Sequence, residues 1–496
     1  MRVGRILGIL LTLLFVSNGH RDAAPQLIYG TYLGGRDKEC TTAIAVSGSG
    51  NAYVVGRTPS PDFPVTPGAA SITTRVNNND WVGFVSKISE RGDRLVYSSF
   101  VGGDFRSSAN AVAVDSSGRA FVAGSTCSSS FPTTPSALLR KAPGSSKIDA
   151  CDGFLAWLNA EGSRLEYATY LGGSSEDAAT ALALSRDGSV IYVAGYTLSP
   201  GFPVAGNPLQ EKLSGTQNGF LSGIDVRSGR LLYSTYLGGT GVDMVTGITV
   251  APDGALYVSG VTHSRKWPSI HLLSLGTLGA TDGFVIRIDP TGRTNPFGIR
   301  IGGSEDEALT SLAVDSSGDV YAVGSTASLI FPLKGQYLSQ TGSAFVVKFN
   351  GAKFARGQAE IIWSRRFGGH GDDALLSVSA GMPGSIFVSG RSGSKDFPTT
   401  TNAFHRSLAV ENDSVLARLR ASDGRIEYAT FVGGTRVPDA SWYNDEATGV
   451  FASPSGDVFV TGCTLDDRLP VSSNALQPRP KGNSEPFVLR MKFPPI

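Results

Sequence analysis

Short apolar runs of four to eight residues alternate with turns rich in Gly, Ser and Asp along most of the chain. The segment from Asp177 to Gly239 shows the pattern clearly, with four apolar runs at 181–184, 190–195, 220–225 and 231–237. Runs of this length bounded by turn residues predict β-strands joined by hairpins. We therefore expect an all-β protein.

This four-strand unit recurs seven times. Each copy contains a Gly-Gly pair, a Gly that ends the second run, an aromatic-Pro dipeptide and a third run that begins near a Phe. The Gly-Gly pairs end at Gly35, Gly103, Gly173, Gly239, Gly303, Gly369 and Gly434. Units of about 66 residues with four strands predict the blades of a β-propeller. The expected fold is a seven-bladed β-propeller with four antiparallel strands per blade. An open solenoid is the alternative, and it would leave both ends unpaired.

The two ends of the chain predict how the ring closes. Residues 26–35 match the fourth strand of the unit, whereas residues 487–493 match the third. The last blade therefore lacks its own fourth strand. We expect the strand at 26–35 to pair with the C-terminal strands at 447–493, which removes two exposed sheet edges. The propeller would then be a single domain over residues 26–493.

Three segments of the repeat carry a family resemblance. They read Tyr-Leu-Gly-Gly-Ser-x-x-Asp-Ala at 170–178, Val-Asp-Ser-Ser-Gly at 114–118 and Phe-Pro-Thr-Thr-Pro at 131–135. The chain resembles the SBBP repeat family of bacterial β-propellers over nearly all of residues 26–493. The resemblance implies an exported or cell-surface bacterial protein. It carries no catalytic residues to this chain.

Charge and the N-terminus narrow the setting of the protein. The net charge of the 496-residue chain is +1, so no strong field exists to recruit nucleic acid. A basic N-terminus and the apolar run 6–16 precede the small residues Ser17 and Gly19, which predicts a signal peptide at 1–19. The run is too short for a membrane span. We expect a secreted or cell-surface monomer without a membrane span after cleavage, and an uncleaved anchor is the alternative.

Four cysteines allow three disulfide connectivities. Cys127 and Cys151 bracket the longest loop between second and third strands. Cys40 begins the first strand of blade one and Cys463 ends the second strand of blade seven, and these blades adjoin at the ring closure. We expect the pairs Cys127–Cys151 and Cys40–Cys463. No CxxC pair occurs, so no metal site is expected from the cysteines.

A carboxylate recurs just before the first strand of the unit. It is present in six of the seven copies, with Ser107 in the other: Glu39, Asp177, Asp243, Glu307, Asp373 and Asp445. Sevenfold geometry would place these groups in a ring at the channel mouth, where they could attract a basic ligand group or Ca²⁺. The alternative is that each carboxylate accepts backbone N–H groups in its own Gly-Gly turn, which a fold role repeated in every blade favours. We expect no cofactor unless the ring binds Ca²⁺.

The long loops lie on one face of the predicted ring, and loops on a rigid scaffold commonly carry binding. The loop before blade seven is extended and contains Trp442, Tyr443 and Asn444, which suit contact with carbohydrate or peptide. A lid over the seam is the alternative. His370 is the best acid–base candidate, although an ordinary surface histidine would look the same.

No catalytic motif appears in a supporting context. We therefore expect a binding or scaffold propeller that presents its long-loop face to a glycan, protein or cell-wall ligand. The alternative is a polysaccharide lyase or hydrolase that uses acidic residues at the channel mouth.

Overall fold

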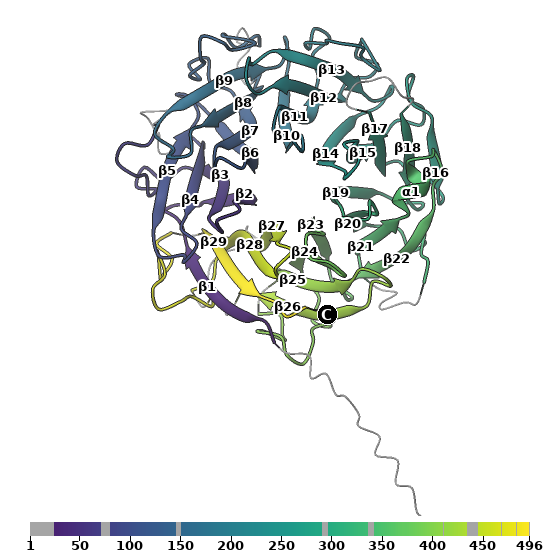
Figure 1. Cartoon of the computed structure of the whole chain (residues 1–496). Coiled ribbons are helices and arrows are strands. Elements are labelled where there is room, and N and C mark those ends of the chain that lie inside the picture. The colour runs from purple at the N-terminus through teal and green to yellow at the C-terminus, as the bar shows by residue number, and fades with distance from the viewer. Residues whose placement is uncertain are drawn as a thin grey trace, which may run out of the picture.

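Seven sheets surround a central axis in the computed structural model (Figure 1). It describes residues 24–70, 80–144, 150–289, 296–335, 342–409, 411–433, 445–467, 469–482 and 484–495. The predicted signal peptide at 1–19 lies outside these residues.

The first four blades contain the following strands. Blade one has β2 (Cys40–Val46), β3 (Ala52–Thr58), β4 (Val82–Ile88) and β5 (Leu95–Val101). Blade two has β6 (Ser107–Val114), β7 (Ala120–Thr126), β8 (Asp152–Leu158) and β9 (Leu165–Leu171). Blade three has β10 (Asp177–Leu184), β11 (Val190–Thr197), β12 (Asn218–Asp225) and β13 (Leu231–Leu237). Blade four has β14 (Asp243–Val250), β15 (Leu256–Thr262), β16 (Leu272–Leu275), β17 (Asp282–Ile288) and β18 (Phe297–Ile301).

The remaining three blades complete the ring. Blade five has β19 (Glu307–Val314), β20 (Val320–Thr326), β21 (Ala344–Phe349) and β22 (Ile361–Phe367), with the short helix α1 (Gly351–Phe354) before β22. Blade six has β23 (Asp373–Ser379), β24 (Ser385–Ser392), β25 (Asp413–Arg420) and β26 (Ile426–Val432). Blade seven has β27 (Glu446–Ala452), β28 (Asp457–Thr464), β29 (Glu485–Lys492) and β1 (Gln26–Tyr32).

Blade seven joins the two ends of the chain. Its strand order is β1-β29-β28-β27, and β1 pairs antiparallel with β29 from Gln26 opposite Lys492 to Tyr32 opposite Phe487. Figure 1 shows the purple β1 against the yellow β29 at the outside of the ring. The predicted fold is confirmed: an all-β, seven-bladed propeller with four antiparallel strands per blade, closed by the N-terminal strand.

Two elements were not predicted from the sequence. In blade four the short strand β16 lies at the outer edge and pairs parallel with β18, so this sheet has five strands. In blade five one helical turn, α1, buries Phe354 against Tyr257 of blade four. Both lie in connections between strands, where the repeat does not constrain the chain.

The core is divided among the contacts between blades. Strands β3, β7 and β11 are buried on both faces over most of their length, since each lies within a sheet packed between two others. One apolar cluster joins Tyr53 and Val55 of blade one to Val122 and Phe154 of blade two. Continuous apolar strands of this kind are expected of sheets covered on both faces.

The aromatic-Pro dipeptide has a structural role that involves a tyrosine near the end of the fourth strand. Tyr236 donates its hydroxyl to the Ser199 carbonyl at 2.7 Å and accepts the Phe202 N–H at 2.9 Å. Tyr170 and Tyr32 bind the equivalent loops in the same way. The hydroxyl thereby holds the loop between second and third strands against its own blade.

Replacing Tyr236 with Phe is expected to lower the free energy of unfolding by about 2 kcal/mol, because a buried carbonyl and N–H lose their partner. Urea unfolding measures the loss. Tyr196→Phe is the matched control, since its hydroxyl contacts Glu176 at an exposed position. Equal effects of the two substitutions would contradict this role.

Candidate functional site

The six recurring carboxylates lie inside the protein. Each of these residues is at most 3% exposed. In blade three the Asp177 Oδ2 accepts the Gly173 N–H at 2.7 Å and the Ser199 hydroxyl at 2.9 Å. The same bond recurs in the next three blades. Gly239 donates its N–H to Asp243 at 2.8 Å, Gly303 to Glu307 at 2.6 Å, and Gly369 to Asp373 at 2.9 Å.

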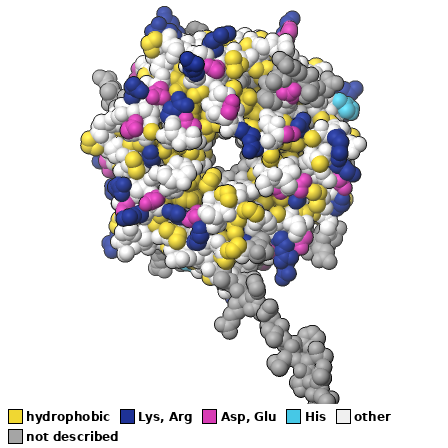
Figure 2. Space-filling view, in the orientation of Figure 1, with side chains coloured by type: hydrophobic (Ala, Val, Ile, Leu, Met, Phe, Trp, Pro, Cys, Tyr) yellow, Lys and Arg dark blue, Asp and Glu magenta, His cyan; other side chains and the backbone are white. Residues whose placement is uncertain are grey.

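These contacts are those of a turn-capping group. In blades three to six the carboxylate holds the Gly-Gly turn and a hydroxyl group at or just after the end of the second strand. In blade seven Asp445 instead accepts the Leu465 N–H at 2.7 Å. In blade two a hydroxyl pair of Ser107 and Thr126 at 2.8 Å occupies the same position. Because the carboxylates are buried, they do not present an open ring of charge at the channel mouth. Figure 2 shows the channel opening with cationic and anionic side chains interspersed around it.

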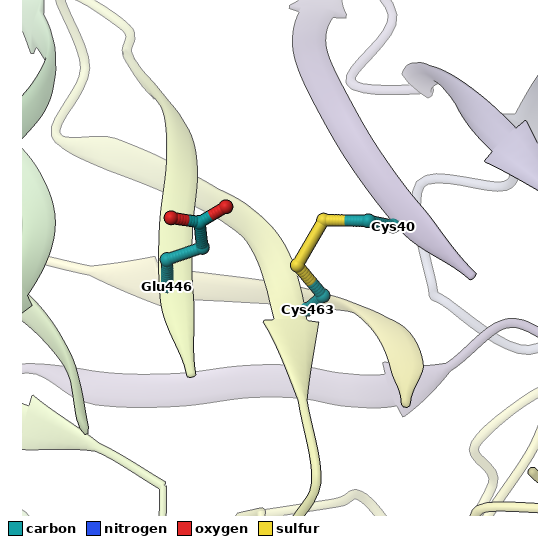
Figure 3. A group of neighbouring side chains, drawn as sticks. All are labelled: Cys40, Glu446 and Cys463. Atoms are coloured by element: carbon teal, nitrogen blue, oxygen red, sulfur yellow. A yellow bond between two sulfur atoms is a disulfide. The ribbon is translucent and has the colours of Figure 1, made fainter. Parts of the chain in front are cut away.

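Both predicted disulfides are present. Cys127 is joined to Cys151 across the long loop of blade two. Cys40 of β2 is joined to Cys463 of β28, which links blades one and seven across a sequence separation of 423 residues. Figure 3 shows this second disulfide beside Glu446 of β27. The ring closure therefore has a covalent link in addition to the β1–β29 pairing.

His370 is on the surface and is paired with an aspartate. Its Nδ1 lies 2.6 Å from the Asp396 Oδ2, and its backbone N–H is donated to the Asp396 Oδ1 at 2.9 Å. The His370 side chain is 77% exposed. The backbone hydrogen bond and the imidazole both lower the pKa of Asp396. The sequence neighbour Asp373 is directed to its own Gly turn instead.

The sequence prediction also named Trp442, Tyr443 and Asn444. These three residues lie outside the described residues. They directly precede Asp445 and Glu446 in the chain, so the described part of blade seven begins where that segment ends.

A charged cluster at the ring closure was missed by the sequence reasoning. Glu446 lies 3.8 Å from the Arg391 guanidinium of blade six. Burial raises the pKa of Glu446, whereas Arg391 and Arg57 lower it. Arg57 of blade one lies over the Trp81 ring, 4.8 Å from its centroid. We call Arg57, Trp81, Arg391 and Glu446 the seam cluster.

The strand register explains how the cluster forms. Cys40 is opposite Arg57 in blade one, and Cys463 is opposite Glu446 in blade seven. The disulfide therefore brings together the strand pairs that carry Arg57 and Glu446. The residue after the Gly that ends the second strand is Ser125, Tyr196, Val261 or Ser325 in blades two to five, but arginine in blades one and six. That difference at one repeat position is the sequence signal for this cluster.

The group of Cys40, Cys463 and Glu446 beside the seam cluster does not fit a metal site. Among the described residues, Cys40, Cys463 and Glu446 form one group whose ligand-type atoms lie within 4.8 Å of one another. Both sulfurs are held in the disulfide, so neither supplies the thiolate that a metal would need. The seam cluster itself offers two guanidinium groups, one carboxylate and an indole, of which Arg57 is exposed and the other three are half-buried.

Comparisons with known proteins agree with the fold. Residues 28–64 match the family model described as SBBP, beta-propeller repeat. The chain is similar to the regulatory protein FlaEY of Caulobacter vibrioides, with 25% identity over 275 residues. That match covers 54% of this chain and 28% of the relative, so the chain spans only a minor part of the relative's length.

Two solved structures can be compared with the chain. The β-propeller domain of Myceliophteria thermophila Cps50 (Swd1) is 8% identical, with 95% of this chain and all of that chain covered and a TM-score of 0.46. An extracellular domain of a putative hybrid two component system from B. thetaiotaomicron is 10% identical, with 88% and 39% covered and a TM-score of 0.41. Across the described residues, no helix has the length and apolar character to cross a membrane. The chain is therefore a seven-bladed β-propeller in which residues 28–64 match the SBBP beta-propeller repeat.

Proposed function

We propose that this protein is an extracytoplasmic binding propeller whose seam cluster binds a glycan that carries carboxylate groups. The observation that supports the proposal is the placement of Arg57 over Trp81 beside Glu446 and Arg391. Guanidinium groups match the planar geometry of a carboxylate, and an indole provides a flat apolar surface for a sugar ring. Two arginines against one glutamate leave a positive charge for such a ligand.

The cluster lies where the repeat pattern changes. Binding groups that are absent from the other blades are expected at one place only, whereas groups present in every blade serve the fold. Trp442, Tyr443 and Asn444 lie just before Glu446 in the chain and have the composition of a carbohydrate-binding loop.

The two disulfides support a location outside the cytoplasm, because disulfides persist in oxidising compartments. We propose that residues 1–19 act as the export signal and that the mature protein is secreted or held at the cell surface. The burial of the six recurring carboxylates favours binding over the alternative of a lyase or hydrolase, since buried groups cannot reach a sugar at the channel mouth.

The mature protein is expected to bind polygalacturonate, a polymer of acidic sugars, and to bind it more weakly as salt is added. Arg57→Ala and Arg391→Ala should each weaken binding by about 10- to 100-fold, since a charge-assisted hydrogen bond contributes about 1.5–3 kcal/mol. Isothermal titration calorimetry measures the affinity.

Arg186→Ala is the matched control, because Arg186 contacts the Pro252 carbonyl from a turn on the opposite face. A neutral glucan that binds equally well would contradict the carboxylate requirement. Unchanged binding in both seam variants would contradict the site. Shortening of the polymer by the wild-type protein would favour the enzyme alternative instead.

A further inference from the structure

Buried polar residues at the start of the third strand face the recurring carboxylates of the next blade. At the contact between blades two and three, Asp152 at the start of β8 faces Asp177 at the start of β10. The two residues are 1% and 0% exposed. The position that a Cβ on Gly172 would occupy lies 2.6 Å from the Asp152 Oδ1 and 2.6 Å from the Asp177 Oδ2. Two carboxyl groups therefore approach each other around a glycine.

The next contact has the same arrangement with one residue changed. Between blades three and four, Asn218 takes the place of Asp152 and Asp243 takes the place of Asp177. The Asn218 Nδ2 donates to the Asp243 Oδ2 at 3.3 Å and to the Gly239 carbonyl at 2.9 Å. A Cβ on Gly238 would again lie 2.5 Å from each side chain. The atom at this position is thus a hydrogen-bond donor facing a carboxylate.

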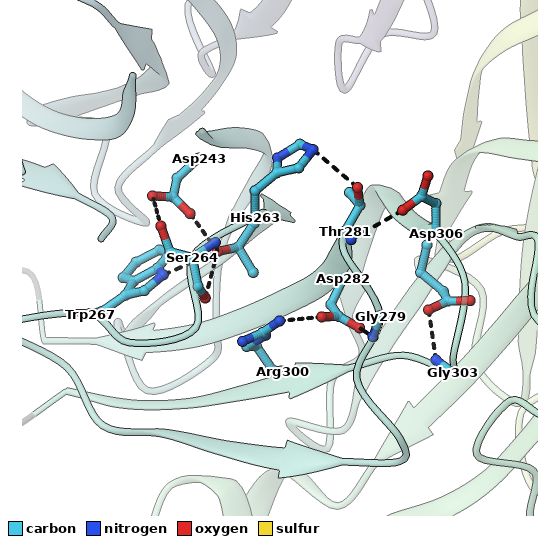
Figure 4. Close-up of polar contacts among 12 residues, drawn as sticks. Asp243, His263, Ser264, Trp267, Gly279, Thr281, Asp282, Arg300, Gly303 and Asp306 are labelled. Carbon is cyan, nitrogen blue, oxygen red and sulfur yellow. Dashed lines mark hydrogen bonds and ion pairs between the residues drawn. The ribbon is translucent and has the colours of Figure 1, made fainter. Parts of the chain in front are cut away.

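At a third contact between blades, an arginine compensates the negative charge of two facing acids. Between blades four and five, Asp282 and Glu307 face each other around Gly302, and Arg300 of β18 is paired with Asp282 (Figure 4). Strand β9 of blade two carries Tyr170 in the place of Arg300, and that hydroxyl is used on the loop at Ser128 and Phe131. No arginine is therefore supplied to Asp152 and Asp177 from this position.

The Asp152 Oδ1 is buried and has no hydrogen-bond partner among the described residues. Its companion Oδ2 accepts the Gly144 N–H at 3.4 Å. Among the described residues, the ionisable groups that act on this pair and on its tyrosine neighbours are acids and phenols: Asp104, Glu176, Tyr170, Tyr196 and Tyr236. If Asp152 were ionised, its Oδ1 would be a hydrogen-bond acceptor facing the Asp177 Oδ2, which is also an acceptor. At the next blade contact, Asn218 supplies a donor in the same position.

We propose that Asp152 carries a proton at neutral pH and donates it from Oδ1 to the Asp177 Oδ2, so that a carboxylic acid–carboxylate hydrogen bond closes the contact between blades two and three. The proton acts as the amide hydrogen of Asn218 does one contact further along. Loss of this proton leaves two buried negative charges facing each other and weakens the contact.

The electrostatics of the pair agree with this geometry. Burial, followed by the charge of Asp177, raises the pKa of Asp152 to about 7, and burial raises the pKa of Asp177 to about 6. Because the two groups interact, they titrate as a pair. An acid whose pKa is raised on folding binds more protons in the folded state, so its stabilising contribution is present at low pH and lost as the pH rises through about 7.

The same device is repeated at the ring closure. Glu39 and Glu485 face each other around Gly34, and burial raises the pKa of Glu485 to about 7. The Gln477 Nε2 also donates to the Glu485 Oε2 at 3.4 Å, so this contact depends less on a proton than the contact between blades two and three. In our proposal the ring is therefore sensitive to alkaline conditions at the contact between blades two and three and, to a smaller degree, at the ring closure.

The natural contact at Asn218 defines the experiment. In the mature wild-type protein, the midpoint of thermal unfolding should fall by several degrees between about pH 5.5 and pH 8.5. Asp152→Asn should reduce this fall and raise the midpoint above wild type at the higher pH, since an amide donates at every pH. Asn218→Asp should add a new fall over the same range. The infrared absorption of a protonated carboxyl should be weaker in Asp152→Asn than in wild type.

Two results would overturn the proposal. An unchanged pH slope in both Asp152→Asn and Asn218→Asp would mean that the pair holds no proton. A rise in the wild-type midpoint with Ca²⁺ that Asp152→Asn abolishes would mean that a metal ion, rather than a proton, lies between the two carboxylates. If one of the two variants does not fold, the pH slope of the other variant still decides whether the pair holds a proton.

Discussion

Replacing Cys40 and Cys463 with Ser is expected to lower the free energy of unfolding by about 5 kcal/mol, because this disulfide closes a very long loop. The sequence separation is 423 residues, so an unfolded chain without the link gains a large conformational entropy. The ring is otherwise closed by the pairing of β1 with β29, by side-chain packing and by hydrogen bonds between blades one and seven, such as those of Thr41 with Gly462 and Thr448. Urea unfolding of the oxidised proteins measures the difference.

The Cys127–Cys151 disulfide is the internal control for this prediction. It spans a sequence separation of 24 residues and lies within one blade. Its replacement by Ser should cost about 3 kcal/mol, since the loss of entropy grows only slowly with loop length. A larger loss for this pair than for Cys40–Cys463 would show that ring closure does not depend on the covalent link.

Arg300→Met is expected to cost about 3–5 kcal/mol, because it leaves a buried charge without its partner. Arg300 is 3% exposed and is paired with Asp282, which is fully buried and also accepts the Gly279 N–H (Figure 4). The substitution keeps most of the side-chain volume but removes the cation beside Asp282 and Glu307. The free energy of unfolding by urea is the measurement.

The double variant Asp282→Asn with Arg300→Met is the matched test of the cause. It recreates the arrangement of Asn218 and Asp243, in which an amide donates to the facing carboxylate. Stability should return to within about 1–2 kcal/mol of wild type, because no buried acid pair is left uncompensated. A double variant as unstable as the single one would mean that Arg300 acts through packing alone.

These contacts suggest why the repeat tolerates different residues at the boundaries between blades. The recurring turn-capping carboxylate must be offset by a facing group. An amide serves at Asn218, a guanidinium at Arg300, and in our proposal a proton at Asp152. Each solution stabilises the same backbone geometry, so the fold is unchanged while the response to pH differs from one contact to the next.

The seam between blades seven and one combines several departures from the repeat. It contains the inter-blade disulfide, the Glu39–Glu485 pair and the seam cluster around Glu446. A ring that is closed by two chain segments far apart in sequence needs additional links at the seam. Residues at the seam that differ from the repeat are available for binding. The proposed site and the closure therefore share one location.

The strand pattern, the number of blades and the use of residues 26–32 to complete blade seven could all be predicted from the sequence, because repetition fixes the register of every strand. The same register predicted both disulfides: Cys40 and Cys463 lie at comparable heights in blades that the ring must bring together. The added strand β16 and the helix α1 could not be predicted, since they occur in connections that do not repeat.

Only the tertiary structure decided the environment of the polar groups. The sequence showed that six carboxylates recur, but their burial and their hydrogen bonds to Gly173 and its equivalents depend on how neighbouring blades pack. It also did not reveal that Asp396 pairs with His370, or that Arg57 and Arg391 flank Glu446. Repetition along the chain determines backbone geometry, whereas burial and charge pairing depend on distances between residues that can lie hundreds of positions apart.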